Sequence, residues 1–392
     1  MKFLRNYIDK IKPNFEEGGK LHAFRSLFDG FETFLFVPND TAKSGVNIHD
    51  AIDSKRIMSL VVIALVPSLL LGMYNIGLQN AIAAGTLETT TWFAMFLYGL
   101  VLTLPKIVVA YAVGLGIEFT VAQWKKEEIH EGFLVSGILI PMIVPVGCPL
   151  WVLALATAFA VIFAKEVFGG TGMNIVNVAL IARAFIFFAY PSVISGDSVW
   201  VATDAICGLG SSVDGYTCAT ALQYVANGAA PVGAAGELLT SSDMIFGFMP
   251  GSIGETSVVA IALGAALLLF TGVASWKTML SVFVGGIAML YVFQDKMPEA
   301  MPLWHNLLLG GFCFGAVFMA TDPVTSARTE TGKYIYGFGI GAMTIIIRVL
   351  NPGYPEGMML AILLMNVVAP FIDYCVVQSN VNARAKRVTK KN

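Results

Sequence analysis

Long runs of apolar residues, separated by short polar stretches, dominate the chain. A run long enough to cross a bilayer is read as a helix, because helices and closed barrels are the structures that satisfy their backbone inside lipid. The stretch 91–105 is also apolar. It is a candidate re-entrant or outer segment, or an eleventh span in addition to the ten given next. The pattern predicts ten spanning helices, at roughly 57–77, 106–123, 132–147, 150–165, 174–190, 257–275, 279–294, 303–320, 334–350 and 357–377.

Composition supports the membrane interpretation. The chain has 392 residues, of which 56% are hydrophobic and 13% are charged, whereas a soluble globular protein carries about 25% charged residues. The polar N-terminus is unlike a signal peptide, so insertion is expected to use internal helices. The basic residues form no patch with interleaved aromatics, which argues against nucleic acid as a partner.

The basic residues are distributed unevenly between the two predicted sides. With a cytoplasmic N-terminus, twenty of the 24 Lys and Arg residues fall in cytoplasmic segments. Lys106 and Lys296 fall near the outer side, and Arg183 and Arg348 fall inside helices. This asymmetry predicts that both termini are cytoplasmic and that the number of spans is even. In a bacterial cell, the outer side of this arrangement is the periplasm.

The same pattern divides the chain into parts. Residues 1–56 are a cytoplasmic extension, and a basic cytoplasmic tail follows the last span. The connection between the two helical halves contains no Lys or Arg and is rich in Gly, Ser, Thr and Asp, so it is predicted to be an ordered periplasmic loop. The remaining boundaries are 57–190 for the first half, 191–256 for the loop, 257–378 for the second half and 379–392 for the tail.

The two halves resemble each other. Ser59–Gly72 aligns without gaps with Ser257–Phe270, and GFLVSGILIPMIVP (132–145) pairs with GFCFGAVFMATDP (311–323). Both pairs lie five helices apart and run in opposite directions. The pattern favours an inverted repeat of five plus five helices, in which Pro and Gly break the helices that line a central site. Chance similarity between apolar helices is the alternative.

Residues typical of soluble enzymes are sparse. The sequence contains no P-loop, no CxxC and no His pair at metal-binding spacing, and the glycine run Gly169–Gly172 does not complete a dinucleotide-binding motif. Cys148, Cys313 and Cys375 suit apolar packing. Cys207 and Cys218 lie in the outer loop and are candidates for a disulfide in an oxidising compartment.

Acidic residues within the spans need a partner or a cation. Glu118 and Asp373 both fall late in their predicted helices, near the cytoplasmic side. Carboxylate oxygens suit a hard cation, and the alternative is a hydrated carboxylate at the interface. Asp322, which precedes Pro323, is predicted to start a helix, with Asp as N-cap and Pro in the first turn.

Four stretches give the chain a specific resemblance. They resemble the B subunit of the sodium-translocating NADH:quinone oxidoreductase, and the homologous D subunit of the Rnf electron-transport complex shares the membrane part. The long cytoplasmic extension favours the former. The stretches are AKEVFGGTGMNIVNVALIARAFIFFAYP (164–191), PGSIGETS (250–257), FMATDPVTS (318–326) and RVLNPGYPEGMMLAILLMN (348–366).

The resemblance assigns a role to the loop motif DGYTCATAL (214–222). In that family a threonine that ends a Ser/Thr-Gly-Ala-Thr motif carries FMN through a phosphoester bond. Thr220 ends the matching sequence here and is the implied attachment site, with Asp214 and Thr217 as candidate FMN contacts. Two positions depart from the family pattern, since Cys218 replaces a glycine and Val178 replaces a proline.

A phosphodiester in this loop would carry a negative charge, and the loop itself offers no cation. Arg183 and Arg348 are the nearest candidates, because each lies a few residues from the outer end of its predicted helix. A guanidinium suits a phosphate or a flavin carbonyl. The alternative is that each arginine extends to the interface or bonds to backbone carbonyls.

The resemblance implies further sites. Glu118 and Asp373 become candidates for sodium uptake, with Asp29 as a weaker one, and Gly114 together with Glu118 becomes a candidate quinone pocket. The same source implies a non-covalent riboflavin, ubiquinone as substrate, and Na⁺ as the transported ion. It also implies a flavin transferase and partner subunits, including a periplasmic one that bears FMN and a cytoplasmic one that oxidises NADH.

These features lead to an expected function. The chain is expected to be an all-α membrane subunit that passes electrons from covalent FMN through riboflavin to ubiquinone, coupled to sodium export. A solute channel or secondary transporter would fit the inverted repeat equally well, and a structural anchor for other subunits is a third alternative. The DGYTCATAL loop distinguishes them, because a channel has no need of a flavin-attachment motif.

Overall fold

The computed structural model describes residues 2–15, 28, 32, 36, 54–125, 132–297, 301–351, 353 and 355–389. The regular secondary structure of these residues is helical, and two isolated β-bridges join Ile206 to Leu209 and Val232 to Leu238. The predicted all-α class is therefore confirmed.

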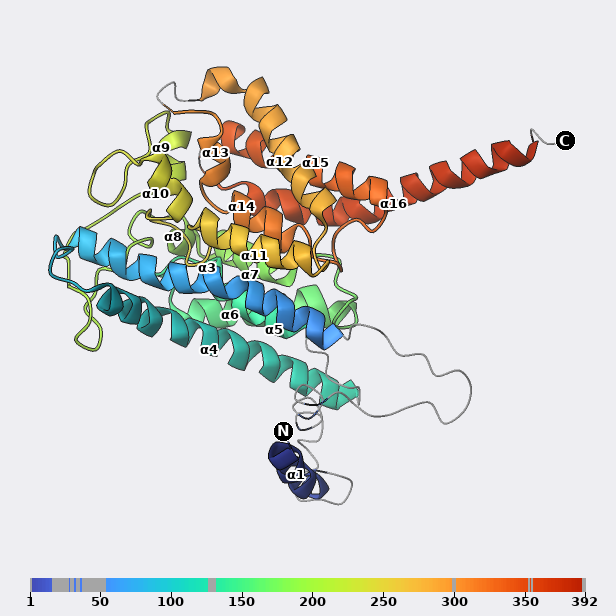
Figure 1. The fold of residues 1–392 in the computed structure, drawn as a ribbon, viewed down its shortest axis with the longest axis horizontal. Helices are drawn as coiled ribbons and strands as arrows, with labels where there is room; N and C mark the ends of the chain where they lie inside the picture. Colours follow the sequence, from blue (N-terminus) through green and yellow to red (C-terminus); the bar gives the residue numbers. More distant parts are fainter. Residues whose placement is uncertain are drawn as a thin grey trace.

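The helices follow one another with few long connections, apart from the loop between α8 and α11 (Figure 1). The label η marks 3₁₀ and π segments. In chain order the elements are α1 (Lys2–Ile11), η1 (Lys12–Asn14), α3 (Ser54–Ala83), α4 (Trp92–Lys125), α5 (Phe133–Met142), α6 (Leu150–Ala160), η3 (Val161–Lys165), η4 (Glu166–Phe168), α7 (Val178–Ala189), α8 (Pro191–Ile194), α9 (Ala221–Ala226), α10 (Ser241–Phe246), α11 (Val258–Phe270), α12 (Trp276–Val292), η5 (Gln294–Lys296), α13 (His305–Leu308), α14 (Phe312–Phe314), η6 (Gly315–Met319), α15 (Glu330–Leu350) and α16 (Met358–Thr389).

Several helices are long and apolar enough to cross a membrane. Among the described residues, five meet both criteria, and α5, α7, α11 and α12 are shorter apolar helices. Large apolar side chains such as Leu70, Leu263, Phe270 and Val284 are exposed on the outer faces of these helices. Water would penalise so much exposed apolar surface, whereas lipid does not. The chain is therefore a multi-span membrane protein. The five long spans are Lys55–Ala83, Trp92–Lys125, Leu150–Phe168, Glu330–Leu350 and Met358–Arg387.

The ten predicted segments all overlap with helical structure, but the expectation of a separate segment at 91–105 is wrong. The apolar stretch 91–105 is not a separate segment, because it is the first half of the continuous helix α4. A proline inside a membrane helix is tolerated where neighbouring groups replace the lost backbone bond, and Pro105 lies inside α4. Lys106 consequently lies within a spanning helix, where it is buried.

The predicted broken helices occur in both halves. Helix α5 ends at Met142, and the residues up to Pro149 are not helical. The matching region of the second half is interrupted between α13 and α14, and it continues as the π segment η6 to Met319. The two segments of this predicted repeat pair, 132–145 and 311–323, are thus short, largely buried and followed by an irregular connection, as in transporters built from inverted repeats.

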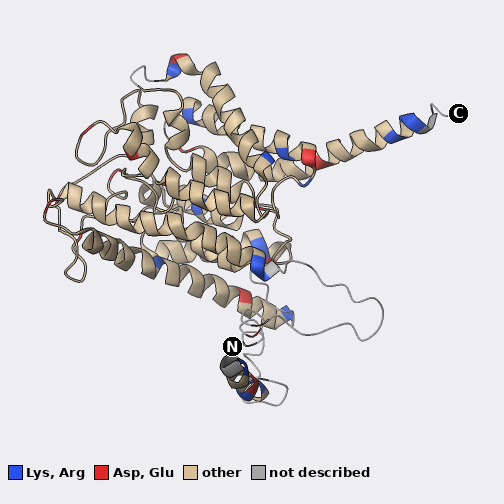
Figure 2. Ribbon diagram, in the orientation of Figure 1, with Lys and Arg blue, Asp and Glu red and all other residues tan. Residues whose placement is uncertain are grey.

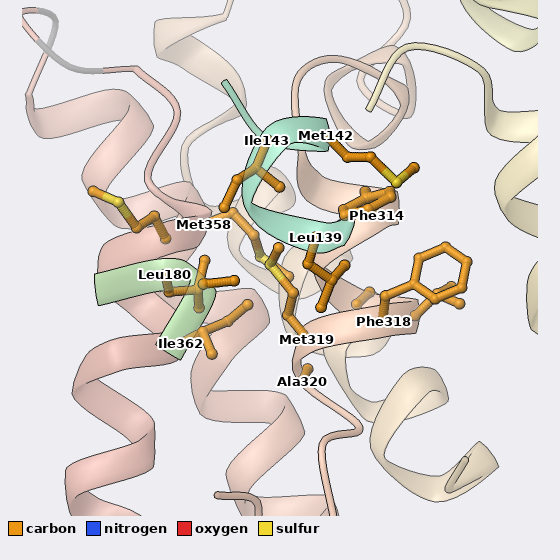
Figure 3. Close-up of a cluster of buried hydrophobic side chains, with 14 of the residues drawn as sticks. Leu139, Met142, Ile143, Leu180, Phe314, Phe318, Met319, Ala320, Met358 and Ile362 are labelled. Carbon is orange, nitrogen blue, oxygen red and sulfur yellow. The ribbon is translucent and has the colours of Figure 1, made fainter. Parts of the chain in front are cut away.

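The broken helices meet in the apolar core of the bundle. Figure 3 shows side chains of α5, α7, the α14–η6 segment and α16 pointing toward one another. Buried Leu139, Leu180, Phe314 and Met319 belong to this cluster. The longer helices surround these side chains. Helices α3 and α4 run side by side as a long pair, α11 lies against α3, and α12 packs on α15 (Figure 1). The core therefore separates the two ends of the bundle.

Charge is confined mostly to the periphery of this arrangement. Figure 2 shows helical bodies with few charged positions, while blue positions gather toward the end of α16 that extends beyond the bundle. Arg384, Lys386 and Arg387 are exposed there. The few charges that lie inside the bundle therefore need a specific explanation.

Candidate functional site

The outer loop between α8 and α11 is anchored on the ends of α3 and α4. Asn80 of α3 is buried, and its side-chain amide donates to the carbonyls of Ala202 at 2.8 Å and Ser211 at 3.0 Å, while it accepts from the Ser211 N–H at 2.9 Å. Tyr98 of α4 donates its hydroxyl to the Asp204 carbonyl at 2.6 Å. Buried side-chain amides that satisfy a loop backbone in this way hold the loop in one position.

The far end of the loop is anchored by the same helix. Asn75 of α3 donates to the Met249 carbonyl at 2.9 Å and accepts from Gln79 at 3.0 Å. A small apolar cluster beneath the loop includes Leu222 and Met249 together with Leu309 of the second half. The loop predicted from composition is therefore ordered and packs onto the bundle.

Thr220 lies at the N-cap of helix α9. Its backbone is extended (φ −69°, ψ 153°), and its hydroxyl oxygen accepts the N–H of Gln223 at 3.3 Å. The residue is partly exposed and lines a pocket with Trp200, Ser252 and Glu255. The hydroxyl thus combines access from outside with a pocket on its inner side. Asp214 and Thr217 are both exposed and do not line this pocket.

A buried ion cluster adjoins this pocket and contributes two glutamates to its wall. Arg183 of α7 is 3% exposed and donates to Glu255 at 2.7 Å, and it also pairs with Glu356. Ser252 accepts from the same guanidinium at 3.5 Å. Both glutamates line the pocket beside Thr220. The planar guanidinium therefore bridges two carboxylates from different loops, which is a geometry that lysine cannot reproduce.

Arg348 of α15 completes the cluster. Its guanidinium donates to the Leu309 carbonyl at 3.0 Å, to the Asn306 carbonyl and, more weakly, to the Glu356 carbonyl at 3.4 Å. The first two acceptors lie at the break between α13 and α14. Arg348 therefore bonds to backbone carbonyls, which is one of the two alternatives left open by the sequence. Its guanidinium also lies next to Gly310, a residue of the pocket wall.

The glycine at this break is required by the cluster. A Cβ atom on Gly311 would lie 2.6 Å from Oε1 of Glu255, so any larger residue would displace the carboxylate. The segment that carries Glu255 is itself held on the first broken helix, because Gly254 N–H donates to the Met142 carbonyl at 2.8 Å. The outer cluster, defined as Arg183, Glu255, Glu356 and Arg348, therefore lies where the breaks of both halves meet.

The two cysteines of the outer loop are free thiols. Cys207 is exposed with a positive φ of 53°, while Cys218 is buried and its N–H donates to the Asp197 carbonyl at 2.9 Å. The disulfide considered from the sequence is not formed. Burial raises the pKa of the Cys218 thiol, and a hydrogen bond from Tyr216 partly opposes this shift.

On the other side of the core, Glu118 forms a buried ion pair with Lys165. Both side chains are 5% exposed. Lys165 ends the π segment η3, and its ammonium lies 5.9 Å from the centre of the Phe133 ring. The same ring packs against Gly114, where an added Cβ would lie 1.9 Å from its Cζ atom. The glycine thus admits the Phe133 ring, while Gly116 faces open space.

Lys165 also lines a partly open cavity of about 100 Å³. Ser136, Asn174, Asn177 and Asp322 contribute polar groups to its wall, and residues of α3, α5 and η6 contribute apolar ones. Asn177 is the N-cap of α7 and accepts the N–H groups of Ala179 and Leu180. This inner cavity thus lies on the α7 N-terminal side of the core, away from the outer cluster.

Asp373 of α16 is tied to the start of α15. Its carboxylate accepts the N–H of Arg328 at 2.8 Å, the N–H of Thr329 at 3.0 Å and the Thr329 hydroxyl at 2.6 Å. Its oxygens are therefore already bound by protein donors. Asp29, the weaker sodium candidate, lies outside the described residues.

The predicted helix start at Asp322 is wrong. The Asp322 carboxylate accepts from the Val324 N–H at 3.1 Å and the Thr325 hydroxyl at 2.9 Å, which closes a turn. The next helix begins at Glu330, with Thr329 as its N-cap. The reason is tertiary, because Asp373 takes the backbone donors of Arg328 and Thr329 and ends the turn before a helix can form.

Lys106 is an internal group that the sequence reasoning does not identify. Its ammonium donates to the carbonyls of Pro145, at 2.9 Å, and Val146, in the connection that follows α5. A cation near the C-terminal end of a helix is favourable, so Lys106 stabilises the break in the first half. A signal exists in the sequence, since a lysine in the middle of a 34-residue apolar run needs internal acceptors.

Comparison with known proteins identifies the family. The sequence pattern of the NQR2, RnfD, RnfE family matches residues 41–382. The chain belongs to this family. It is 43% identical over 409 residues to the B subunit of the Na(+)-translocating NADH-quinone reductase of Chromohalobacter salexigens, an alignment that covers 98% of this chain and 96% of the relative.

Other relatives in the NQR2, RnfD, RnfE family give the same picture. Proteins of the same name from Azotobacter vinelandii and Klebsiella pneumoniae strain 342 are 42% and 41% identical, and each alignment covers 98% of this chain and 99% of the relative. The similarity thus includes the outer loop, both broken helices and the segments that carry Arg183, Glu255, Glu356 and Arg348.

Proposed function

We propose that the chain is the B subunit of a sodium-translocating NADH:quinone oxidoreductase in the bacterial inner membrane, with both termini in the cytoplasm. The full-length similarity to proteins of that name supports the assignment. The observation that carries it is local: Thr220 lines a pocket together with Glu255 and Glu356, the two carboxylates of the outer cluster. A subunit without a redox cofactor has no evident use for this arrangement.

The pocket at Thr220 suits a covalently attached FMN. The threonine is partly exposed, so a flavin transferase has access to it from the periplasmic side. The hydroxyl-bearing residues Ser252 and Thr256 line the pocket next to it and suit phosphate oxygens. FMN attached there would supply one- and two-electron redox chemistry. The residues of the chain would tether it, orient it and exclude water.

Arg183 and Arg348 lie next to the pocket wall, where they would influence the redox properties of an attached flavin. Arg183 is fixed between Glu255 and Glu356, and Arg348 lies behind Gly310. Because Glu255 and Glu356 balance the two arginines, the outer cluster is formally neutral, and it would act on an attached flavin through the fixed positions of its charges. We therefore assign both arginines to tuning the attached flavin, and we assign Asp214 and Thr217 to recognition of the exposed motif by the transferase.

The inner cavity is the proposed site of a non-covalent riboflavin. Its polar wall of Lys165, Asn174, Asn177 and Asp322 offers donors and acceptors for the edge of a flavin ring, and the apolar wall suits the ring faces. The cavity of about 100 Å³ is smaller than a typical cofactor pocket of about 300 Å³ or more, so riboflavin binding requires that its walls move apart. Electrons would then cross the core from the outer pocket to this cavity and pass to ubiquinone near Gly114 and Glu118.

Sodium export is the proposed coupled process. Glu118 and Asp373 remain the candidate uptake groups among the described residues, and Asp29 is the candidate in the extension. Because Asp373 already accepts from three protein donors, sodium binding there requires that the start of α15 move. A periplasmic partner that bears FMN would deliver electrons to Thr220-bound FMN, and a cytoplasmic partner would oxidise NADH.

Flavin attachment tests the proposal. The purified chain, produced with its flavin transferase, is expected to give a fluorescent band in a denaturing gel. The tryptic peptide that follows Arg183 and ends at Lys277 should gain the mass of FMN. Thr220→Ala should abolish both signals, whereas the matched variant Thr240→Ala, which changes the N-cap threonine of α10 in the same loop, should retain them. If the chain is a channel or an anchor without flavin, neither the parent chain nor the variants will show a fluorescent band.

A further inference from the structure

A basic cleft lies at the end of the bundle where α12 and α15 begin. It has a volume of about 460 Å³ and is walled by the turn before α12, the segment that follows η6 and the first turn of α15. The cations Lys277, Arg328 and Lys333 line it, together with Glu330. None of these groups belongs to the flavin or quinone sites proposed above.

The charges of the cleft are held loosely. Glu330 pairs with Lys277 and bonds to Lys333 at 2.7 Å, but its own side chain is 63% exposed. An exposed ion pair of this kind contributes little to stability, so another anion can replace Glu330 at small cost. The hydroxyl-bearing residues Ser275, Thr321 and Ser326 also line the cleft. Ammonium, guanidinium and hydroxyl groups together match the oxygens of a phosphate.

An exposed apolar stripe starts at this cleft. Trp276, Leu280, Val284, Ile287 and Tyr291 recur along one face of α12, and all five are exposed. In a membrane-spanning helix such a face contacts lipid chains. Trp276 is at the end of the stripe that meets the cleft, where it packs edge-on against Tyr334. Aromatic residues at such positions mark the boundary between hydrocarbon and headgroups.

The adjoining helix continues this surface. Ile335 and Phe338 of α15 are exposed, and α15 packs along α12. The ammonium of Lys277 lies 5.8 Å from the Trp276 ring and 6.0 Å from the Tyr334 ring, so the charge is held at the end of the apolar surface. A ligand that matches both parts carries a phosphate at one end and hydrocarbon chains at the other.

We propose that this cleft binds the headgroup of an anionic phospholipid, with its acyl chains along the exposed stripe of α12. Basic pockets between membrane helices recognise such headgroups. The lipid would replace Glu330 as the partner of Lys277 and Lys333. This inference requires the membrane-spanning fold and not the flavin sites, so the two proposals can fail independently.

Lipid titration followed by native mass spectrometry tests this proposal. The full chain in detergent is titrated with phosphatidylglycerol and, separately, with zwitterionic phosphatidylcholine. The test variant is K277Q/R328Q/K333Q. The matched control is R384Q/K386Q/R387Q, which removes the same charge from the exposed end of α16. Since basic groups near a membrane attract anionic headgroups, the cleft variant should bind phosphatidylglycerol about tenfold or more weakly than the control, with phosphatidylcholine binding unchanged.

Two further measurements keep the proposal open to refutation. Glu330→Gln releases two lysines and should tighten phosphatidylglycerol binding by several-fold, so weaker binding in that variant contradicts the proposed exchange of partners. Inorganic phosphate should compete only weakly, because it lacks acyl chains. If phosphate binds as tightly as the lipid, or if both triple variants lose lipid equally, the cleft is not a lipid site.

Discussion

The outer cluster around Arg183 and the inner ion pair around Lys165 lie on either side of the same apolar core, and they are built differently. The outer cluster joins a guanidinium to two carboxylates from separate loops. The inner pair joins one ammonium to Glu118 beside a cavity. A rigid multidentate arginine fixes its surroundings, whereas a lysine on a flexible stem can exchange partners. The outer site is therefore expected to be fixed, and the inner one to be the site that can rearrange.

The largest expected effect that tests this comparison comes from Arg183→Met. The substitution leaves Glu255 and Glu356 without their shared cation, so breaking the buried cluster should cost about 3–5 kcal/mol of stability. Thermal unfolding in detergent, followed by tryptophan fluorescence, measures the loss. Arg183→Lys keeps the charge but not the fork, and its stability should fall between those of the parent chain and Arg183→Met. A loss below about 1 kcal/mol for Arg183→Met would mean that water already reaches the glutamates.

A smaller loss is expected from Lys165→Met. It strands one carboxylate, that of Glu118, and the adjoining cavity gives this group room to relax, so about 3 kcal/mol is expected. The double variant Lys165→Met/Glu118→Gln removes both charges and should recover most of the stability, which the double-mutant cycle reports as a coupling energy. The same thermal unfolding measures the four proteins of the cycle, which are the parent chain, Lys165→Met, Glu118→Gln and the double variant. Additive losses would show that the two groups do not depend on each other.

The sequence alone predicts the class of fold and several residues of the candidate site. Apolar length locates all ten helical segments, and Pro and Gly content locates both broken helices. Arg183 and Arg348 are predicted from their depth in apolar helices, where a charge needs a partner. These features depend on local composition, which a single sequence contains.

The partners cannot be found in the same way. Glu255 stands in a motif that carries the family resemblance, but nothing local indicates that it reaches Arg183 across 72 positions. In the sequence, Lys165 is one of the twenty basic residues assigned to cytoplasmic segments. In the structure, its side chain is buried against Glu118. The helix expected at Asp322 is absent because Asp373, far along the chain on α16, binds the backbone at Arg328 and Thr329. Such errors arise wherever a distant group competes with a local preference.

A more local effect is expected at the loop that covers the outer cluster. Asn80→Ala removes the side chain that binds the backbone at Ala202 and Ser211, and leaving such groups without a partner costs about 1–3 kcal/mol. Hydrogen exchange of residues 202–213 should accelerate while the helices keep their protection. Thr90→Ala is the control, since the Thr90 hydroxyl bonds to the nearby Thr86 carbonyl. Equal exchange in both variants would show that Asn80 does not hold the loop.

The smallest effect expected is a difference in thiol reactivity, and it reports whether that loop opens over the fixed outer site. The thiolate is the reactive form of cysteine, and burial raises the pKa of Cys218, so its thiolate fraction near neutral pH is low. A maleimide at about pH 7 should label the exposed Cys207 at least about tenfold faster than Cys218, as peptide mass spectrometry of a Cys375→Ser protein would measure.

Raising the pH toward about 9 should narrow the ratio of the two labelling rates, because more of the Cys218 thiol then ionises. Tyr216→Phe removes a bond that favours its thiolate and should slow Cys218 further at fixed pH. If Cys218 instead reacts as fast as Cys207 at neutral pH, the loop opens frequently, and the outer cluster is no more fixed than the inner pair.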